Sequence, residues 1–188
     1  MLKDLNIVIG MSGGIACYKV CSIISFLKKE GANVNVIMTK SALEFITVLT
    51  LETLSNNPVV TDMFEKRIKH DVEHISLARK ADLLLIAPAT ANIIGKVANG
   101  IADDMLSTVI MASKSKVIFA PAMNDAMYEN EIVQSNINKL KNYGYSFIEP
   151  DVGNLACGYK AIGKLANIEK IIDHLMKILE GDSMWKLL

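Results

Sequence analysis

The sequence predicts an α/β fold, in which a mostly parallel β-sheet lies between two layers of helices in a three-layer, Rossmann-like arrangement. Apolar runs at 6–9, 83–86 and 117–119 have the length and composition of strands buried on both faces, and 34–38 is expected to be a further strand. Helix-like sequence follows the three apolar runs, and alternating strands and helices form right-handed βαβ units around a parallel sheet. Because 188 residues suit one such domain, we expect a single domain over 1–188.

The helices and loops follow from the residues between these runs. An amphipathic helix is expected from about 15 to 30, where Gly31 ends it, and a terminal helix is expected over 168–179. The segment 152–164 contains Gly153, Gly158 and Gly163 and has little apolar periodicity. This composition predicts a loop that moves as a flap.

Composition and charge exclude several classes of function. Twenty acidic residues balance twenty basic ones, so we expect no nucleic-acid partner. Neither an apolar run of about 18 residues nor a signal peptide is visible, so we expect no membrane insertion. Three cysteines are too few and too oddly spaced for a disulfide framework or a zinc site. We therefore expect no bound metal and a cytoplasmic, reducing location. The 51% hydrophobic content is high for a monomer and favours apolar surface buried between subunits.

Ligands of open parallel sheets bind at the carboxyl ends of the strands, and the first strand is followed there by a glycine turn at 10–14. Glycines let backbone amides approach an anion at the start of a helix. The spacing matches neither the dinucleotide fingerprint nor the P-loop. Thr39, Lys40 and Ser41 stand where a dinucleotide site needs an acid for the ribose. This favours a mononucleotide phosphate over NAD, with a plain tight turn as the alternative.

Two further clusters follow the third and fourth strands, at 87–92 and 121–124. Small residues in the first leave room for a flat ring against the backbone. Thr90 and Asn92 either bind the edge of such a ring or cap the next helix. Asn124 either caps the helix that begins at Asp125 or donates a hydrogen bond to a substrate carboxylate.

The candidate proton-transfer groups are Cys157 and His74. Cys157 lies in the glycine-rich segment, and an ordinary thiol, with a pKa of about 8.5, stays protonated at neutral pH and serves as an acid. Cys17 and Cys21, four residues apart on one helix, are expected to be core residues. His74 is expected in the first turn of a short helix before the third strand. A lone histidine is more often structural than catalytic, but the alternation around His74 could turn it inward.

Taken in order, these clusters resemble those of the homo-oligomeric flavin-containing cysteine decarboxylases, over nearly the whole chain from Ile7 to about Ile172. The motifs that carry the resemblance are GGIACYK at 13–19, Met38-Thr39 with Phe45, His74-Ile75, APATAN at 87–92, PAMN at 121–124 with Met127-Tyr128, and Ala156-Cys157-Gly158 followed by Gly163-Lys164. Two departures are visible. Cys17 stands where alanine is usual, and Tyr159-Lys160 stand where an acidic residue is common.

The resemblance implies an FMN-dependent enzyme whose sites lie between the subunits of a trimer, which can assemble further into a dodecamer. Ser12, Gly13 and Gly14 would then hold the FMN phosphate, with Thr39 and Phe45 nearby. The residues expected at the isoalloxazine ring or ribityl chain are Pro88, Ala89, Thr90, Ala91, Asn92 and Ala122.

The activity implied by the resemblance is a step of coenzyme A synthesis. Phosphopantothenoylcysteine would be oxidised and decarboxylated, and then reduced to 4′-phosphopantetheine. By resemblance His74 would be the base, Asn124 would bind the substrate carboxylate, and Cys157 would protonate the enethiolate. Met123, Ala156 and Gly158 would contact the substrate. The synthetase that makes this substrate would be a fused or separate partner.

Three other functions fit parts of the same pattern. A peptidyl-cysteine decarboxylase shares the fold and flavin, but often lacks the cysteine of the Ala156-Cys157-Gly158 motif. A flavin prenyltransferase is disfavoured by His74 and by the PAMN motif at 121–124. A non-catalytic FMN-binding regulator would leave the candidate catalytic groups without a role.

Overall fold

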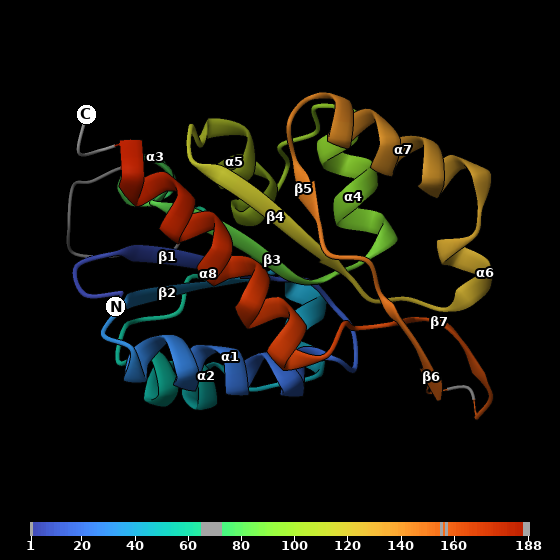
Figure 1. The fold of residues 1–188 in the computed structure, drawn as a ribbon, viewed down its shortest axis with the longest axis horizontal. Helices are drawn as coiled ribbons and strands as arrows, with labels where there is room; N and C mark the ends of the chain where they lie inside the picture. The colour runs from blue at the N-terminus through green and yellow to red at the C-terminus, as the bar shows by residue number, and fades with distance from the viewer. Residues whose placement is uncertain (1, 65–72, 155, 157, 186–188) are drawn as a thin grey trace.

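The computed structural model describes residues 2–64, 73–154, 156 and 158–185, and places a five-stranded parallel sheet at their centre (Figure 1). The sheet has the order β2-β1-β3-β4-β5. Its strands are β1 (Asn6–Met11), β2 (Asn33–Met38), β3 (Leu83–Ala89), β4 (Lys116–Pro121) and β5 (Ser146–Phe147). The four longer strands contain the three apolar runs and the further strand expected at 34–38, so the predicted parallel α/β architecture is confirmed.

Helices cover both faces of this sheet (Figure 1). One face carries α1 (Cys17–Lys29), α2 (Val48–Ser55) and α8 (Ile168–Trp185). The other face carries α3 (Glu73–Lys80), α4 (Ala91–Ala98), α5 (Met105–Ala112) and α7 (Glu131–Asn142). Two short helices, η1 (Lys40–Glu44) and α6 (Asp125–Tyr128), follow the ends of β2 and β4.

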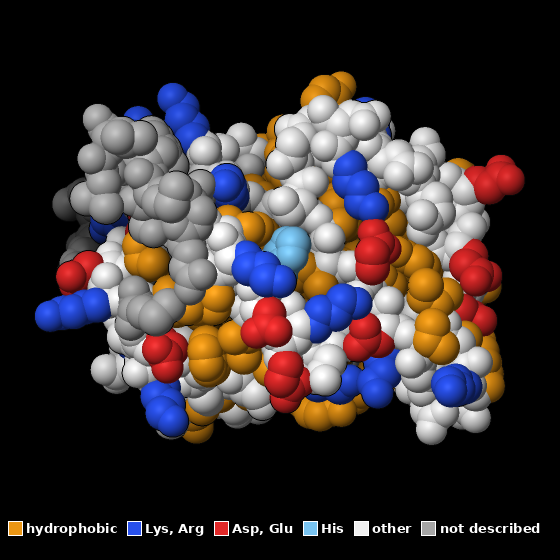
Figure 2. All heavy atoms as spheres, viewed as in Figure 1, with side chains coloured by type: hydrophobic (Ala, Val, Ile, Leu, Met, Phe, Trp, Pro, Cys, Tyr) orange, Lys and Arg blue, Asp and Glu red, His pale blue; other side chains and the backbone are white. Residues whose placement is uncertain are grey.

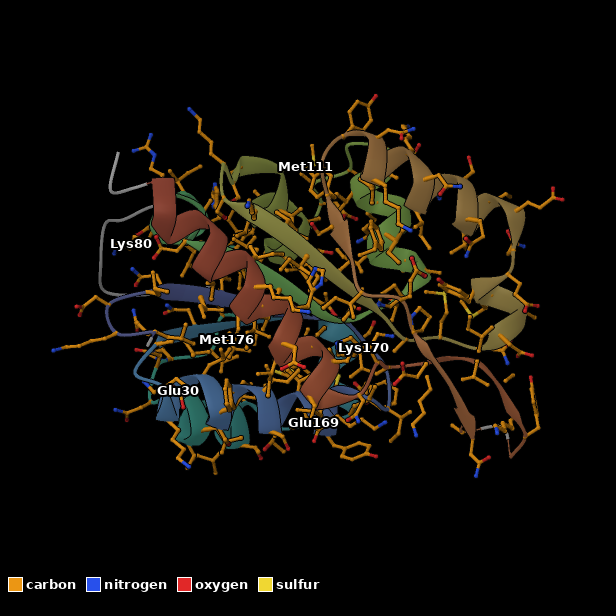
Figure 3. The ribbon with its side chains drawn as sticks, in the orientation of Figure 1. Glu30, Lys80, Met111, Glu169, Lys170 and Met176 are labelled. Atoms are coloured by element: carbon orange, nitrogen blue, oxygen red, sulfur yellow. The ribbon has the colours of Figure 1, made fainter. Side chains whose placement is uncertain are left out.

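Strand β3 shows why the core has two halves. All seven of its residues are buried. Leu83 and Leu85 pack with α1 and α8, whereas Leu84 and Ile86 pack with α4 and α5, because successive side chains of a strand point to opposite faces. Side chains of α8, Met176 among them, pack against the first of these halves (Figure 3).

The strand order fixes where a ligand can bind. From β1 the chain crosses to β2 on one side, and it then returns to place β3 on the other side of β1. This reversal opens a crevice beyond the carboxyl ends of β1 and β3, the usual ligand site of doubly wound sheets. Two turns line this switch point, one after Met11 at the end of β1 and one after Ala89 at the end of β3.

The prediction of a loop is wrong for 152–154 and 160–164, whereas the expectation that this segment moves as a flap stays a prediction. Strands β6 (Asp151–Asn154) and β7 (Lys160–Lys164) pair antiparallel there and form a hairpin. The glycines interrupt the alternation of apolar and polar residues by which a strand is recognised. They do not prevent pairing, because backbone hydrogen bonds hold the two strands together whatever their side chains. Gly153 lies against the Lys164 side chain of the paired strand, since a Cβ there would come within 2.8 Å of Lys164 Cδ.

Helix ends agree with the predictions within a few residues. Helix α1 begins at Cys17, two residues later than expected, and Gly31 follows its end with a φ of 93°. Helix α8 continues past 179 to Trp185. As expected, Cys17 lies in the core, and Cys21 is partly buried against it.

The described surface is mixed in charge. Figure 2 shows acidic and basic side chains interspersed across one face, with apolar side chains between them. Among the described residues, no helix combines the length and the apolar character needed to cross a bilayer. Nor do three or more potential metal ligands gather anywhere in that part of the chain.

Helix α7 provides a matched test of the core. Ile137 is 2% exposed in the half of the core beneath α4, whereas Ile132 on the same helix is 72% exposed. Ile137→Ala should lower the free energy of unfolding by about 2–5 kcal/mol, because it removes buried methyl groups and leaves a cavity. Ile132→Ala should change it by less than about 0.5 kcal/mol. Urea denaturation of both variants would measure this, and equal losses would contradict the packing of α7.

Candidate functional site

A buried serine joins the ends of the two strands at the switch point. Ser12, 2% exposed, donates its hydroxyl proton to the Pro88 carbonyl at 2.6 Å. The same hydroxyl accepts a hydrogen bond from the Thr90 amide at 3.0 Å. The turn after β4 is tied on in turn, since the Ala122 amide donates to the Ala89 carbonyl at 3.0 Å. Three of the four predicted clusters therefore form one connected edge of the sheet.

The glycine turn after β1 packs directly against the turn after β2. A Cβ on Gly13 would lie 2.4 Å from Ser41 Cβ, so only glycine allows this approach. At Gly14 the nearest neighbour of such a Cβ would be Pro88 Cγ at 3.9 Å, which leaves open space. Helix α1 starts beside this space, and no side chain of the described residues caps it. Its first turn also lacks acidic residues, so its amides favour an anion.

Thr39 adds an unsatisfied polar atom to the same place. Its backbone amide donates to the Met11 carbonyl at 3.0 Å, which fixes it next to the end of β1. Its Oγ1 is buried, and the described residues offer it no hydrogen-bond partner. Buried hydroxyls without a partner are uncommon and point to a missing ligand or water. Phe45, just after η1, is 45% exposed, so its ring is available to a ligand or a neighbouring subunit.

The structure shows which side chain of the clusters at 87–92 and 121–124 caps a helix and which does not. Thr90 occupies the N-cap position of α4, but within the described part of the chain its side chain makes no capping hydrogen bond. Its hydroxyl therefore keeps the ligand interpretation. Asn124 does cap α6, because its Oδ1 accepts from the Ala126 amide at 3.0 Å. Because the cap uses only Oδ1, the Nδ2 group of Asn124 can donate hydrogen bonds outside α6.

The hairpin docks on this asparagine. Nδ2 of Asn124 donates to the hydroxyl of Tyr159 at 3.0 Å, and that hydroxyl donates to Asp125 Oδ1 at 2.6 Å. The bond from Tyr159 lowers the pKa of the Asp125 carboxyl. The Met123 amide donates to the Gly163 carbonyl at 3.0 Å, and a Cβ on Gly163 would lie 2.2 Å from the Met123 carbonyl oxygen. Gly163, with a φ of 120°, is therefore required for this contact.

A second set of bonds holds helix α6 in place. The Tyr128 hydroxyl donates to the Glu149 carboxylate, to which Lys141 Nζ is also bound at 2.7 Å. Burial raises the pKa of Tyr128, and its bond to Glu149 raises it further. Burial opposes ionisation of Glu149, but the bonds from Lys141 and Tyr128 lower the pKa of its carboxyl. These bonds fix the position from which Asn124 faces the hairpin.

The structure does not bring all the predicted catalytic residues together in one chain. His74 lies in the first turn of α3, as predicted, but α3 packs on α5 at the end of the sheet away from the β6–β7 hairpin (Figure 1). Cys157 lies outside the described residues. Its neighbours Ala156 and Gly158 are exposed in the segment that joins β6 to β7. Within one chain, the edge of the sheet therefore meets Asn124 and the hairpin but not His74.

Sequence reasoning missed the role of Tyr159. It was visible only as a departure from the family pattern, and no local signal links it to Asn124, 35 residues away. The link depends on how the hairpin docks, which a sequence pattern does not encode.

We expect Tyr159→Phe to loosen the hairpin without unfolding the sheet, because it removes both hydroxyl bonds and keeps the ring. Amide hydrogen exchange in β7 should become roughly fivefold faster, while exchange in β3 stays unchanged. Tyr143→Phe, at an exposed site after α7, is the matched control. Unchanged protection of β7 would show that the Tyr159 bonds do not hold the hairpin.

Known proteins are similar to this chain over most of its length. The family model described as "Flavoprotein" matches residues 1–180. The coenzyme A biosynthesis bifunctional protein CoaBC of Borreliella burgdorferi is 53% identical over 173 residues, which cover 92% of this chain and 44% of that protein. The chain thus spans less than half the length of this bifunctional relative. A "probable phosphopantothenoylcysteine decarboxylase" of Streptococcus mutans is 44% identical, over 90% of this chain and 96% of that protein.

Solved structures share the fold over almost the entire chain. A Cys→Ser mutant of a PPC decarboxylase, complexed with pantothenoylaminoethenethiol, matches with a TM-score of 0.83 and 30% identity. The alignment covers 94% of this chain and 98% of that one. The FMN-dependent cysteine decarboxylase SpaF matches with a TM-score of 0.81 and 28% identity, over 92% and 95% of the two chains. From the family model and these relatives together, the chain belongs to the Flavoprotein family.

Proposed function

We propose that this chain binds FMN and decarboxylates phosphopantothenoylcysteine, giving 4′-phosphopantetheine and carbon dioxide. The observation that carries the proposal is the connected edge of the sheet. There an open glycine turn and a Thr39 hydroxyl with no partner among the described residues lie next to a hairpin docked on Asn124. A relative matched over 96% of its length is named for this reaction, and a structural neighbour holds an enethiol of the pantothenoyl series.

The residues at this edge fit FMN. A phosphate at the start of α1 would accept hydrogen bonds from the amides near Gly14 and from the free Oγ1 of Thr39. Ala122, which is only partly buried and whose amide is bonded to the Ala89 carbonyl, presents little side-chain bulk to a flat ring, whereas Ala89 itself is fully buried in the core. The hydroxyl of Ser12 is already bonded to Pro88 and Thr90, so its contribution to the phosphate site would be to fix the two turns. A direct contact between Ser12 and the phosphate stays a prediction.

The chemistry needs an electron sink, because the carboxylate of a cysteine derivative has none of its own. Bound FMN supplies hydride removal from the carbon that bears sulfur and hydride return at the end. Oxidation at that carbon gives a thioaldehyde, which takes up the electron pair when the carboxylate leaves. The Nδ2 group of Asn124 would hold that carboxylate through a neutral donor, so that the carboxylate is bound without an ion pair that opposes its departure.

Proton transfers are assigned to the remaining two groups. His74 would accept the thiol proton of the substrate before oxidation, which requires an imidazole within hydrogen-bond reach of that sulfur. Cys157 would then donate a proton to carbon as the enethiolate is reduced, since an ordinary thiol is protonated at neutral pH. These roles follow from the motifs and from the family's chemistry.

The position of His74 supports a site shared between subunits. Helix α3 lies at the end of the sheet away from the hairpin and from α6, which Asn124 caps (Figure 1), so one chain by itself leaves the base and the carboxylate-binding group apart. Large apolar side chains close to the glycine turn and η1 are exposed, namely Ile15 at 60%, Phe45 at 45% and Leu49 at 72%. A neighbouring subunit would cover such residues. We therefore propose a trimer, or a multiple of it, in which His74 serves the site of its neighbour.

Two further assignments belong to the same proposal. The fusion of the corresponding unit to a second half in the bifunctional relatives supports a phosphopantothenoylcysteine synthetase as the partner that supplies the substrate. A decarboxylase of peptidyl cysteine is the second candidate, favoured by the similarity to SpaF. The two candidates differ in substrate and not in chemistry.

Anaerobic incubation with phosphopantothenoylcysteine tests the function directly. The holoprotein should contain about one FMN per chain, release carbon dioxide and yield 4′-phosphopantetheine by mass spectrometry. A peptide that ends in cysteine is the comparison substrate and should react far more slowly. Turnover of the peptide alone would support the second candidate, and the presence of FMN without turnover of either substrate would support a binding role.

Mixed assemblies test the shared site. His74→Asn and Asn124→Ala should each be inactive in decarboxylation while retaining FMN. Because a shared site needs one residue from each of two chains, co-expression of the two variants should restore roughly a quarter of the sites in a symmetric trimer. Carbon dioxide release per FMN gives the readout, and a mixture of His74→Asn with itself is the control. No recovery in mixed trimers would place both residues in the same chain's site.

A further inference from the structure

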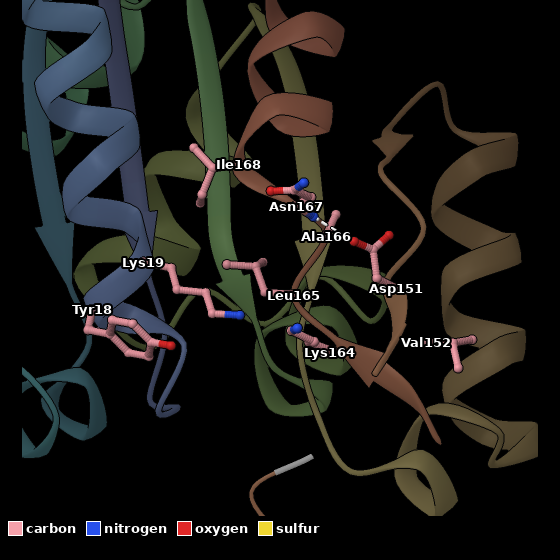
Figure 4. Close-up of a pocket in the computed structure, with 9 residues that line it drawn as sticks. All are labelled: Tyr18, Lys19, Asp151, Val152, Lys164, Leu165, Ala166, Asn167 and Ile168. Carbon is pink, nitrogen blue, oxygen red and sulfur yellow. Dashed lines mark hydrogen bonds between the residues drawn. The ribbon is translucent and has the colours of Figure 1, made fainter. Parts of the chain in front are cut away.

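A second hollow lies beside the docked hairpin, between this hairpin and the first turn of α1 (Figure 4). Its volume is about 400 Å³, which is enough for a phosphate group and part of the arm that carries it. Tyr18 and Lys19 line it from α1, Asp151 and Lys164 from the hairpin, and Ala166 and Asn167 from the turn into α8. None of the functional residues assigned above lies in its wall.

Two lysines make this hollow positive. The Lys19 and Lys164 side chains extend from α1 and β7 toward the same space (Figure 4). No carboxylate of the described residues lies within ion-pair distance of either ammonium group. Asp151, the one acid in the wall, is already engaged by Lys170 Nζ at 3.0 Å and by the Asn167 amide at 2.7 Å. Asp151 also interacts electrostatically with Lys19 and with Lys164 and offsets part of their charge. The two lysines still outnumber this acid, which also bonds Lys170, so the hollow keeps the positive charge expected at an anion site.

The electrostatics of Lys19 agree with this geometry. Burial lowers the pKa of the Lys19 ammonium, the nearby charge of Lys164 lowers it further, and the charge of Asp151 opposes both effects without cancelling them. A bound dianion would remove this repulsion between the two lysines. Lys19 Nζ also lies over the ring of Tyr18, at 5.9 Å from the ring centroid, within the range of a cation–π contact.

The hollow lies within reach of the proposed reaction site. Lys164 directly follows Gly163, whose carbonyl is bonded to the Met123 amide, next to Asn124. A substrate carboxylate on Asn124 would leave the rest of the molecule to run along β7. The phosphopantothenoyl arm is about as long as four residues of extended backbone, on the order of 14 Å. Because Lys164 is only one residue beyond Gly163, an arm of that length anchored at Asn124 is long enough to reach the two ammonium groups.

We infer that this hollow is the subsite for the terminal phosphate of the substrate, with Lys19 and Lys164 as its two cationic ligands. The inference rests on the proposed function and adds the residues that make the enzyme prefer a phosphorylated substrate. Lysines bind phosphate as point charges, and two of them match the charge of a dianionic monoester. The phosphate of FMN has the same chemistry, but the unpartnered Thr39 hydroxyl and the open glycine turn provide it with a separate place.

Paired substrates test the assignment. In the holoenzyme, Lys19→Gln and Lys164→Gln should each raise KM for phosphopantothenoylcysteine about tenfold and leave kcat nearly unchanged. The KM for pantothenoylcysteine, which lacks the phosphate, should not change. Lys29→Gln at the exposed end of α1 and Lys160→Gln on β7 are controls outside the hollow and should behave as wild type.

Each other outcome overturns the inference in a recognisable way. An equal rise in KM for both substrates would mean that the lysines only support the hairpin. Loss of FMN from either variant, measured by flavin absorbance per chain, would assign the lysines to the cofactor phosphate instead.

Binding without turnover separates this inference from the proposed function. Calorimetry on the holoprotein should show 4′-phosphopantetheine binding at least tenfold more tightly than pantetheine, with the difference lost in the double variant Lys19→Gln, Lys164→Gln. If the wild type turns over neither substrate yet keeps this preference, the proposed function fails and the phosphate subsite stands. Equal affinities for the two compounds would overturn the subsite even in an active enzyme.

Discussion

The hydroxyl of Ser12 is the interaction on which the rest of the site depends. It is buried between the ends of β1 and β3, and it both donates to the Pro88 carbonyl and accepts from the Thr90 amide. These bonds fix the spacing between the turn after β1 and the turn after β3, which are more than seventy residues apart in sequence. A buried polar group that loses its partner costs about 1–3 kcal/mol, so this geometry is strongly preferred over a looser one. The glycine turn, Thr39 and the start of α4 all take their places around this bond.

The β6–β7 hairpin then completes what the sheet begins. A parallel sheet alone offers an open edge, which suits a flat cofactor but gives a flexible substrate little to hold. The hairpin docks on the turn after β4 through Gly163 and Tyr159, and so places a second wall opposite α1. Its strands bring Lys164 to the side that faces Lys19. In this account the sheet edge determines the cofactor, and the hairpin determines which cysteine derivative is accepted.

Local patterns in the sequence predicted the parts of this arrangement that local physics controls. Apolar runs marked β1, β3 and β4, because a strand covered on both faces has no polar side, and Gly31 marked the end of α1. The hairpin was missed because glycines replace the alternation that identifies a half-buried strand. The contact of Tyr159 with Asn124 and the approach of Lys19 to Lys164 depend on docking between distant segments. In the proposed shared site, the relation of His74 to Asn124 would depend on assembly, which the sequence pattern of one chain does not encode.

The central claim is that the cradle at the switch point holds a flavin phosphate beside Thr39. A crystal structure of the protein reconstituted with FMN measures this most directly. The account predicts a phosphate oxygen within about 3 Å of Thr39 Oγ1, with the other oxygens facing the amides at Gly14 and the start of α1, and the Ser12 bonds unchanged. A phosphate bound between Lys19 and Lys164, with Thr39 Oγ1 still unpartnered, would contradict it.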